Sequence, residues 1–364
     1  MIPLTLARYF AWRFLGAALA VFVGVFVLVV LIDYVELMRR ASQIPNVSAW
    51  TVAKTSFFRV PQVTERLMPF AVLIGAMSCF LNLSRRLELI VARAAGMSAW
   101  QFVAPSVVVA LLLGIGATAI YNPLSATLRE QSKRLESQLF DEHSSGLQVI
   151  SGGFWVRQRT PEGEQSIINA TTSRGQGADL GGVSIFRFDQ TGRFLERIEA
   201  KSAALEPGHW RLEQARIYSS GASVREFDTY LVSTTLTTEQ VRESFATPET
   251  VSFWQLPLYI EIADQAGLGA AGYRLQYQVL LARPFHFIAM VLLAAAVSLR
   301  FFRFGGVPKM VLSGIAAGFL LYVLSKVTED VSKAELMHPV AAAWLPVLFG
   351  AVTGSMVLLY QEDG

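Results

Sequence analysis

The chain has 364 residues, of which 53% are hydrophobic and only 16% are charged. A soluble domain carries about 25% charged residues, and here the deficit lies in long uncharged runs, so the composition excludes a soluble protein and indicates an integral membrane protein. The formal net charge is +3, and no basic run is interleaved with stacking aromatic residues, which excludes a nucleic-acid-binding surface.

Uncharged runs long enough to cross a bilayer recur along the chain, since a membrane-spanning helix needs about 20 mostly apolar residues. The first run follows Arg8 and Arg13, as in a signal peptide, but it is too long for a signal peptide and no small-x-small cleavage site follows it. It is therefore expected to be a retained span. Asn122-Pro123 is expected to stop the third span. The six expected spans are 14–32, 67–83, 102–121, 278–299, 310–325 and 338–360.

A short stretch between spans two and three, residues 84–97, combines one carboxylate with small side chains. Wound at 100° per residue, Glu88, Ala92 and Ala95 share one helical face, with Arg85 and Gly96 at its edge. Small side chains let another surface approach closely, so the pattern suggests a short helix that docks into a partner's groove. The alternative is an amphipathic loop helix that rests on lipid, and the pattern alone leaves both open.

The insert between spans three and four changes character. Residues 124–142 look like a polar helix, and about eight short strands are expected between 147 and 240. The segments 186–188 and 193–195 flank a hairpin turn, and Glu206-Pro207-Gly208 marks another turn. This spacing predicts a sandwich or jelly roll. The fold class is therefore membrane α-helical, with six transmembrane helices and an inserted β domain that is a sandwich or a jelly roll; the expected domains are 1–123, 124–265 and 266–364.

Spans five and six each carry two glycines at four-residue spacing, which permits close helix crossing but is also common by chance in glycine-rich spans. These candidates for helix packing or for a gate are Gly314, Gly318, Gly350 and Gly354.

Lysine and arginine in the short loops predict the orientation, because cytoplasmic loops carry the excess of positive charge. The basic N-terminus, the loop at 84–97 and the turn at 300–309 fall on one side, which is expected to be cytoplasmic. Both termini then lie inside and the β domain outside. Arg39 and Arg40 break the rule at the outer end of span one. This pair could attract anionic lipid phosphates, or it could be a snorkelling boundary anchor.

Several signatures of self-powered or catalytic proteins are missing from the sequence. There is no G-x-x-x-x-G-K-[ST] loop, no G-x-S-x-G and no H-E-x-x-H. No span carries an acidic pair or histidine relay for proton-driven transport. The lone Cys79 and four scattered histidines give no metal-ligand spacing, so no cofactor or metal is expected. If the protein transports anything, the energy must therefore come from a partner, which favours the docking interpretation of 84–97.

Three segments resemble the LptF/LptG lipopolysaccharide-export permeases, with LptG-type members the closer match. They are Leu-Ala-Arg-Tyr-Phe at 6–10, the stretch from Leu83 to Met97, and Val-Ser-Phe-Trp-Gln-Leu-Pro at 251–257. The resemblance extends over essentially the whole chain. It implies a six-span permease of the Gram-negative inner membrane with a periplasmic β-jelly roll. The implied partners are an LptF-type sister permease, an LptB-type ATPase dimer, an LptC-type single-span protein and lipopolysaccharide.

The resemblance also implies roles for individual residues. Glu88 would be the coupling-helix carboxylate that engages the ATPase, and Arg39 and Arg40 would meet the phosphates of the lipid. Some family members place a lysine about two turns before that pair, where this chain has Asp33. Spans one and five would form gates. The residues expected around Glu88 in the coupling surface are Arg85, Arg86, Ala92, Arg93, Ala95 and Gly96.

Three other interpretations remain. An ABC-type permease for a lipoprotein or other envelope substrate would usually place its large external domain after the first span, whereas here the insert follows the third. An intramembrane enzyme acting on lipid would need polar residues that converge at one depth, and the sequence gives no sign of them. A structural scaffold would not need the 84–97 pattern. Copurification with an ATPase would distinguish transport from the last two.

Overall fold

The computed structural model describes residues 4–42, 48–140, 148–159, 164–174, 179–189, 193–219, 223–234, 248–265, 270–302 and 306–363. The chain divides into two compact units. A helical unit comprises Met1–Leu139, Pro248–Pro257 and Ala271–Gly364, and a β unit comprises Phe140–Thr247 and Leu258–Ala270. Residues 124–139, which the sequence assigned to the β domain, thus belong to the helical unit.

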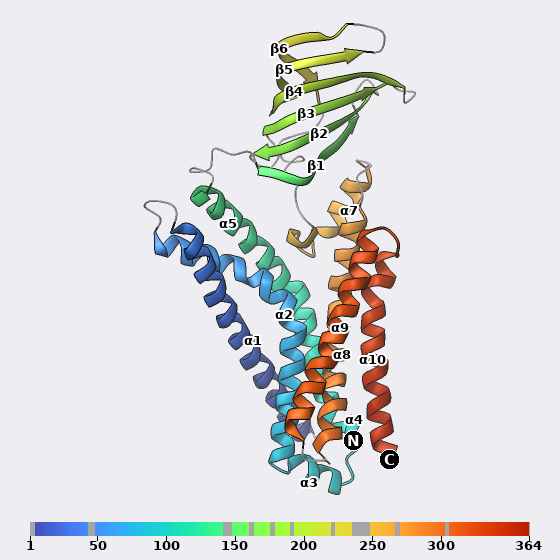
Figure 1. The fold of residues 1–364 in the computed structure, drawn as a ribbon. Coiled ribbons are helices and arrows are strands. Elements are labelled where there is room, and N and C mark those ends of the chain that lie inside the picture. Colours follow the sequence, from blue (N-terminus) through green and yellow to red (C-terminus); the bar gives the residue numbers. More distant parts are fainter. Residues whose placement is uncertain are drawn as a thin grey trace. The chain divides into compact units, whose positions relative to one another are not determined.

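Among the described residues, six helical segments are long and apolar enough to cross a membrane, which confirms the predicted fold class (Figure 1). A seven-residue helix, α3 (Glu88–Ala94), joins the second segment to the third. The six segments are α1 (Leu4–Ala41), α2 (Ala49–Arg85), α4 (Ala99–Gly116) continued by η1 (Ala117–Tyr121) and α5 (Asn122–Phe140), α8 (Ala271–Phe302), α9 (Val307–Lys333) and α10 (Pro339–Asp363).

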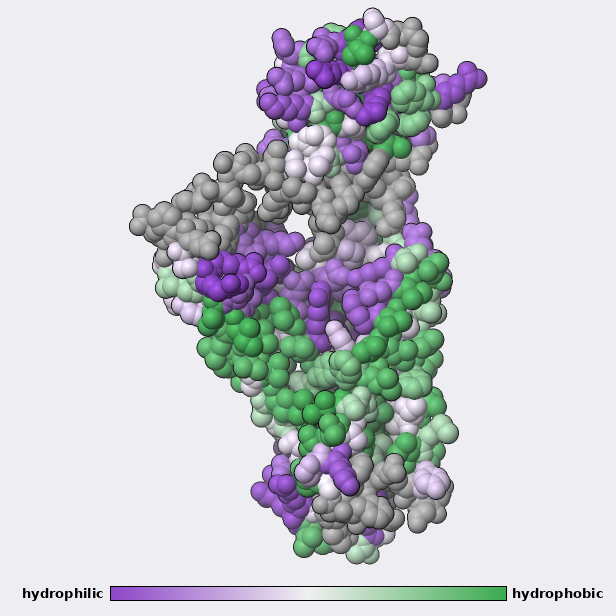
Figure 2. Space-filling view, viewed as in Figure 1, coloured by the Kyte–Doolittle hydropathy of each residue, from purple (hydrophilic) through white to green (hydrophobic). Residues whose placement is uncertain are grey.

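The membrane-spanning helices differ strongly in how much of their apolar surface the chain itself covers. Within the most apolar window of each helix, 61% of the residues are buried in α2 and in α8, against 22% in α9 and 6% in α1. Figure 2 shows the resulting apolar band across the viewed face of the helical unit, with hydrophilic surface beyond both of its edges. Thus α2 and α8 form the centre of the unit, whereas α1 and α9 leave apolar faces for lipid or for another protein.

Glycines set the closest helix contacts. A Cβ at Gly75 of α2 would overlap the backbone of Ala18 in α1, and one at Gly114 of α4 would overlap Pro284 in α8. A Cβ at any of the four glycines of spans five and six would also overlap atoms of a neighbouring helix. Those of α9 lie against α2, and those of α10 lie against α8 and α9; the contacts are Gly314 with Met77, Gly318 with Leu73, Gly350 with Leu321 and Ala289, and Gly354 with Leu292.

The third span does not stop at Asn122-Pro123, contrary to the prediction from sequence. The helix passes through the π-helical segment η1, where the N–H of Asn122 bonds to the carbonyl of Ala117, and continues as α5. Proline normally interrupts a helix because it lacks an N–H and its ring crowds the preceding turn. The wider π turn immediately before Pro123 changes the bonding register at this point, so the chain continues without a break.

The β unit contains one antiparallel sheet whose described strands follow one another in the order β1 to β6 (Figure 1). The predicted inserted β domain is therefore confirmed, and so are the hairpin with Phe188 opposite Phe194 and the turn at Gly208, whose φ is +82°. The described strands number six instead of about eight, and their meander order differs from the crossing connections of a jelly roll. They are β1 (Gln148–Arg159), β2 (Gln165–Arg174), β3 (Asp179–Phe188), β4 (Phe194–Glu206), β5 (His209–Ser219) and β6 (Arg225–Ser233).

One face of this sheet is apolar and buried, as alternating side chains of a half-buried strand require. Ile185 lies opposite Ile198, which lies opposite Ile217, and all three are almost fully buried. Trp210, also fully buried, belongs to the same cluster. The β unit thus has its own hydrophobic core.

The contact between α1 and α2 gives a first prediction. Gly75→Ala should destabilise the protein by about 1–3 kcal/mol, because the new methyl group has no free space and the two backbones must separate. The measurement is the thermal unfolding temperature in detergent. Gly24→Ala is the matched control, since a Cβ there would meet nothing within 4 Å. Equal unfolding temperatures for the two variants would show that the close contact at Gly75 does not stabilise the fold.

Candidate functional site

The loop between α2 and α4 builds a short, sharply bounded helix. Leu87 adopts a left-handed conformation with φ of 63°, and α3 begins at the next residue, Glu88. Few residues other than glycine adopt this conformation, so the turn at Leu87 is a strained feature. A second left-handed residue, Gly96 with φ of +81°, follows the helix, and Ser98 then caps α4 through a capping box.

The faces of α3 differ in part from those predicted. Leu89 and Ala92 are 3% and 8% exposed and pack inside the chain, whereas Leu87 and Val91 are 57% and 66% exposed. Ala92 therefore adds little to any surface for a partner, contrary to its assignment to the docking face. Of the other predicted residues, Glu88 and Arg93 are half-buried, while Arg85, Arg86, Ala95 and Gly96 are exposed.

The carboxylate of Glu88 is bonded to the beginning of α1. The hydroxyl of Tyr9 lies 3.0 Å from Oε2 and 3.2 Å from Oε1 of Glu88. Arg13, one turn further along α1, donates from Nε to the Tyr9 hydroxyl at 3.0 Å. The carboxylate is thus oriented by the chain itself while it remains partly exposed.

Arg39 and Arg40 lie in the last turn of α1 and share an acidic partner. Nη2 of Arg39 is 2.8 Å from Oε2 of Glu36, and Nε of Arg40 is 2.9 Å from Oε1. All three side chains are substantially exposed. Exposed ion pairs of this kind contribute only about 0–1 kcal/mol, so the two guanidinium groups can exchange Glu36 for another anion at little cost.

A second charged cluster, which sequence reasoning missed, connects α1, α2 and α5. Arg59 lies 3.5 Å from Asp33 and 3.1 Å from Glu136. Arg129 is electrostatically coupled to all three, yet its Nε and Nη1 are buried and have no hydrogen-bond partner among the residues that the structure describes. An unmet buried donor costs about 1–3 kcal/mol. Arg129 therefore has unused capacity to bind an anion, which the polar pattern of 128–136 did not reveal.

At the centre of the helical unit, a buried carboxylate joins three elements. Glu65 of α2 accepts hydrogen bonds from Arg283 of α8 at 2.5 Å, and from Asn122 and Ser125 of α5 at 2.8 and 2.5 Å. The side-chain oxygen of Asn122 accepts in turn from the backbone N–H of Phe253 at 2.8 Å. Each partner comes from a distant part of the chain, so no local pattern in the sequence could show this cluster.

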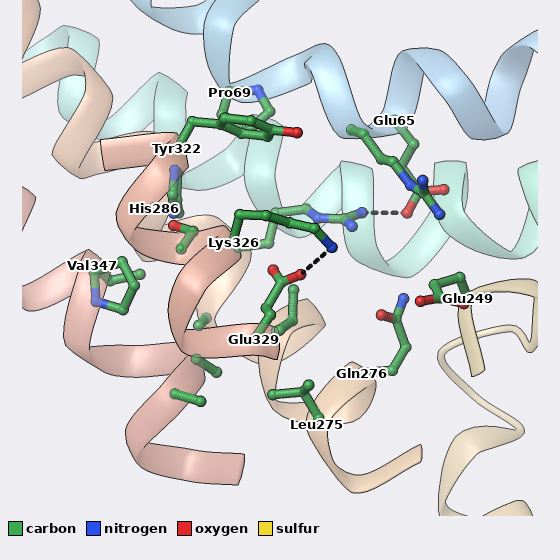
Figure 3. A pocket seen from close by; sticks show the side chains of 18 of the residues that line it. Glu65, Pro69, Glu249, Leu275, Gln276, His286, Tyr322, Lys326, Glu329 and Val347 are labelled. Carbon is green, nitrogen blue, oxygen red and sulfur yellow. Dashed lines mark hydrogen bonds and ion pairs between the residues drawn. The ribbon is translucent and has the colours of Figure 1, made fainter. Parts of the chain in front are cut away.

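A cavity of about 240 Å³ lies beside this cluster, between α2, α8, α9 and α10 (Figure 3). In Figure 3, Lys326 and Glu329 of α9 face each other, and their charged atoms are 4.0 Å apart. Apolar side chains such as Phe70 and Met290 also line the cavity. No convergence of polar residues within the spans was expected from sequence, and the structure shows that Glu65, Arg283, Lys326 and Glu329 converge beside this cavity.

At the rim of the cavity, Lys333 binds Glu249 of η3 (Pro248–Thr250) at 2.9 Å. Partial burial raises the pKa of Glu249, but the hydrogen bond and positive charge of Lys333 outweigh it, so the pKa lies below its usual value. Glu249 therefore stays ionised, and its ion pair with Lys333 holds the end of α9 to η3.

Comparison with known proteins decides the family. A family model described as "Lipopolysaccharide export system permease LptF/LptG" matches residues 8–360. The chain belongs to this family. The LptF/LptG resemblance seen in the sequence is thereby confirmed, and family membership together with six apolar helices makes this a multi-pass protein of the inner membrane.

Two relatives can be aligned with this chain over most of their own length. "Lipopolysaccharide export system permease protein LptG" of Escherichia coli K12 is 23% identical over 322 residues, which is 87% of this chain and 87% of that protein. The protein of the same name from Haemophilus influenzae Rd is 23% identical over 361 residues, 98% of this chain and 96% of the relative. Within the family, the chain is thus similar to LptG-type proteins.

The three segments that suggested the LptF/LptG family take part in two contacts within the helical unit. The opening segment meets the 83–97 stretch through Tyr9 and Glu88. The segment 251–257 meets the π-helical turn of the third span, where the indole N–H of Trp254 donates to the carbonyl of Ala119 at 3.1 Å. Both contacts join segments that are far apart in the sequence.

The buried cluster gives a second prediction. Glu65→Ala should destabilise the permease by about 3–5 kcal/mol, because it leaves the Arg283 guanidinium buried without its counter-charge. Glu65→Met combined with Arg283→Met should cost less, since it removes both charges. The measurement is thermal unfolding in detergent. Glu226→Ala, which removes an exposed partner of Arg216, is the control and should change stability by no more than about 1 kcal/mol. A loss from Glu65→Ala as small as the control's would contradict the prediction.

Proposed function

We propose that this chain is the LptG-type permease subunit of an ATP-driven ABC transporter. The transporter extracts lipopolysaccharide from the inner membrane and passes it to a periplasmic bridge that leads toward the outer membrane. The observation that carries the proposal is the match of residues 8–360 to the LptF/LptG family. Its partners would be an LptF-type sister permease, an LptB-type ATPase dimer and an LptC-type single-span protein that receives the lipid.

In this proposal α3 is the coupling helix. Figure 1 places α3 at the end of the helical unit where α1 begins and α10 ends, which supports the predicted topology with both termini and the 84–97 loop on the cytoplasmic side. Lys309 of the turn at 300–309 is exposed; Arg303 and the Arg300 side chain lie outside the described residues. The exposed surface around Glu88, with Leu87 and Val91, is the part that an ATPase groove would receive.

At the opposite end of α1, basic side chains would hold the phosphates of the lipid. Arg39 and Arg40 are exposed and only weakly retained by Glu36, so a phosphate can replace it with charge-assisted hydrogen bonds. The uncommitted nitrogens of Arg129 support a further phosphate contact. Asp33 binds Arg59, which reduces the positive charge available in this part of the site.

Two such permeases would enclose a cavity with apolar walls for the acyl chains. Only 6% and 22% of the residues in the most apolar windows of α1 and α9 are buried within the chain. This supports their role as gates toward neighbouring proteins, because their apolar surfaces remain available for contact with other membrane helices. No nucleotide-binding loop is present in the sequence. Closure of the ATPase dimer would therefore move the coupling helices, compress the cavity and drive the lipid upward.

The alternative is an ABC-type permease for a lipoprotein or another envelope substrate. The β unit is inserted after the third membrane helix and not after the first, which disfavours this alternative. Copurification with an ATPase and a sister permease, followed by lipid analysis of the complex, tests both. Lipopolysaccharide in the complex supports the proposal, and another lipidated cargo in its place overturns it.

Glu88 gives a third prediction. Glu88→Ala should leave the fold intact, because the carboxylate is partly exposed and is not part of the core. It should weaken binding of the ATPase or lower lipopolysaccharide export by roughly tenfold, as expected for the loss of a charged hydrogen bond. The measurement is export in reconstituted vesicles together with copurification of the ATPase. Glu226→Ala in the β unit serves as the control. Normal export by Glu88→Ala would remove Glu88 from the mechanism.

Arg39 and Arg40 give a fourth prediction. Replacing both by Glu should lower photo-crosslinking to lipopolysaccharide severalfold and leave complex assembly nearly unchanged, since each charge near the surface contributes about 1 kcal/mol to attraction of an anionic lipid. Glu36→Gln frees both guanidinium groups and should keep or raise the crosslinking yield. Unchanged crosslinking in the double variant would count against a role in substrate binding.

A further inference from the structure

Tyr9 lies in the segment 6–10, whose role the proposed function leaves open, and it bonds to the carboxylate of Glu88, 79 residues away in the sequence. We propose that Tyr9, supported by Arg13, is a positioning residue that holds Glu88 in the orientation in which α3 meets the ATPase. The same bond links α1 directly to the coupling helix. The inference rests on the proposed coupling role of Glu88.

The direction of the hydrogen bonds follows from the groups involved. Arg13 has only donors, and its Nε lies 3.0 Å from the Tyr9 hydroxyl, so the hydroxyl oxygen accepts this bond. The hydroxyl proton is then available for Glu88. The guanidinium of Arg13 also lies 5.2 Å from the centre of the Tyr9 ring, which keeps the ring in place. A chain of donors that ends at a carboxylate strengthens each of its bonds.

Glu88 stays available to a partner while Tyr9 holds it. A carboxylate has about four acceptor positions, and a single hydroxyl proton shared between both oxygens leaves the others open. Glu88 is half-buried and Tyr9 is 37% exposed, and the side chains of Leu87, just before α3, and of Val91, within it, are exposed. A cationic group of the ATPase can therefore approach Glu88 without displacing Tyr9.

The surrounding structure seats α3 against α1. Leu89, the residue after Glu88, belongs to the same buried cluster as Phe10 and Phe14 of α1. The left-handed turn at Leu87 fixes the start of α3. The buried side chain of Leu89 therefore anchors α3 in a core to which α1 also contributes, and the Tyr9 hydroxyl fixes the direction of the carboxylate. Movement of α3 would reach α1, a proposed gate, without passing along α2.

The test uses the complete complex of this chain with the sister permease and the ATPase in nanodiscs. Tyr9→Phe removes the hydroxyl and keeps the ring, so the fold is retained. It should raise the Kd for the ATPase about threefold to tenfold, as for the loss of a hydrogen bond to a charged group, and lower the lipopolysaccharide exported per ATP hydrolysed. Tyr360→Phe is the control, because the side chain of Tyr360 is 83% exposed.

A double variant separates the two proposals. Tyr9→Phe should add nothing in a Glu88→Ala background, because Tyr9 acts through that carboxylate. If Glu88→Ala weakens ATPase binding but Tyr9→Phe does not, or if Tyr9→Phe costs as much in both backgrounds, the positioning role of Tyr9 is overturned while the coupling role of Glu88 stands. If Glu88→Ala itself changes neither binding nor export, the coupling role fails, and the role of Tyr9 fails with it.

Discussion

The helical unit depends on how it satisfies one buried carboxylate, that of Glu65. An ionised group inside a membrane protein is expensive unless it is paired and hydrogen-bonded. Here the compensating groups come from α5 and α8, so the bonds that neutralise Glu65 also bring three spans together. The contact of Gly114 with Pro284, the residue after Arg283, fixes α4 against α8 at the neighbouring position. The two contacts hold the centre of the unit, around which the more exposed spans α1 and α9 are arranged.

Most of the fold could be predicted because its signals are local. Runs of about 20 apolar residues reveal spans, and alternating strands with turn residues reveal hairpins such as the one at Gly208. The continuation of the third span past Pro123 could not be predicted, because the π turn that allows it is held by distant groups. The side chain of Asn122 accepts from the N–H of Phe253, and the indole N–H of Trp254 donates to the carbonyl of Ala119. The rule that proline ends a helix considers only neighbouring residues in the sequence, so it cannot take account of these distant partners.

The candidate site also has some features that could be predicted from local sequence and others that could not. The short helix between spans two and three was visible in the pattern of 84–97, but its faces were partly misplaced, because periodicity shows which residues share a face and not which face packs against the rest of the chain. Glu88 and Ala92 are about one turn apart in α3, yet Ala92 is 8% exposed and packs inward. The pairing of Glu36 with Arg39 and Arg40 follows from helical spacing and could be predicted. Arg283 binds Glu65 from 218 residues away, and no periodicity indicates such a pair.

The glycines of α9 have a mechanical consequence. At Gly314 and Gly318 the helix lies directly against α2, whereas from Tyr322 to Lys333 it borders the cavity. The segment of α9 beyond Gly318 is about 22 Å long at 1.5 Å per residue. It borders the cavity on one side, and the hydroxyl of Thr328 holds it to the carbonyl of Ala342 in α10. A tilt of about 10° would displace the tip by about 4 Å. The ion pair between Lys333 and Glu249 is at this tip, where a small force acts with the greatest leverage.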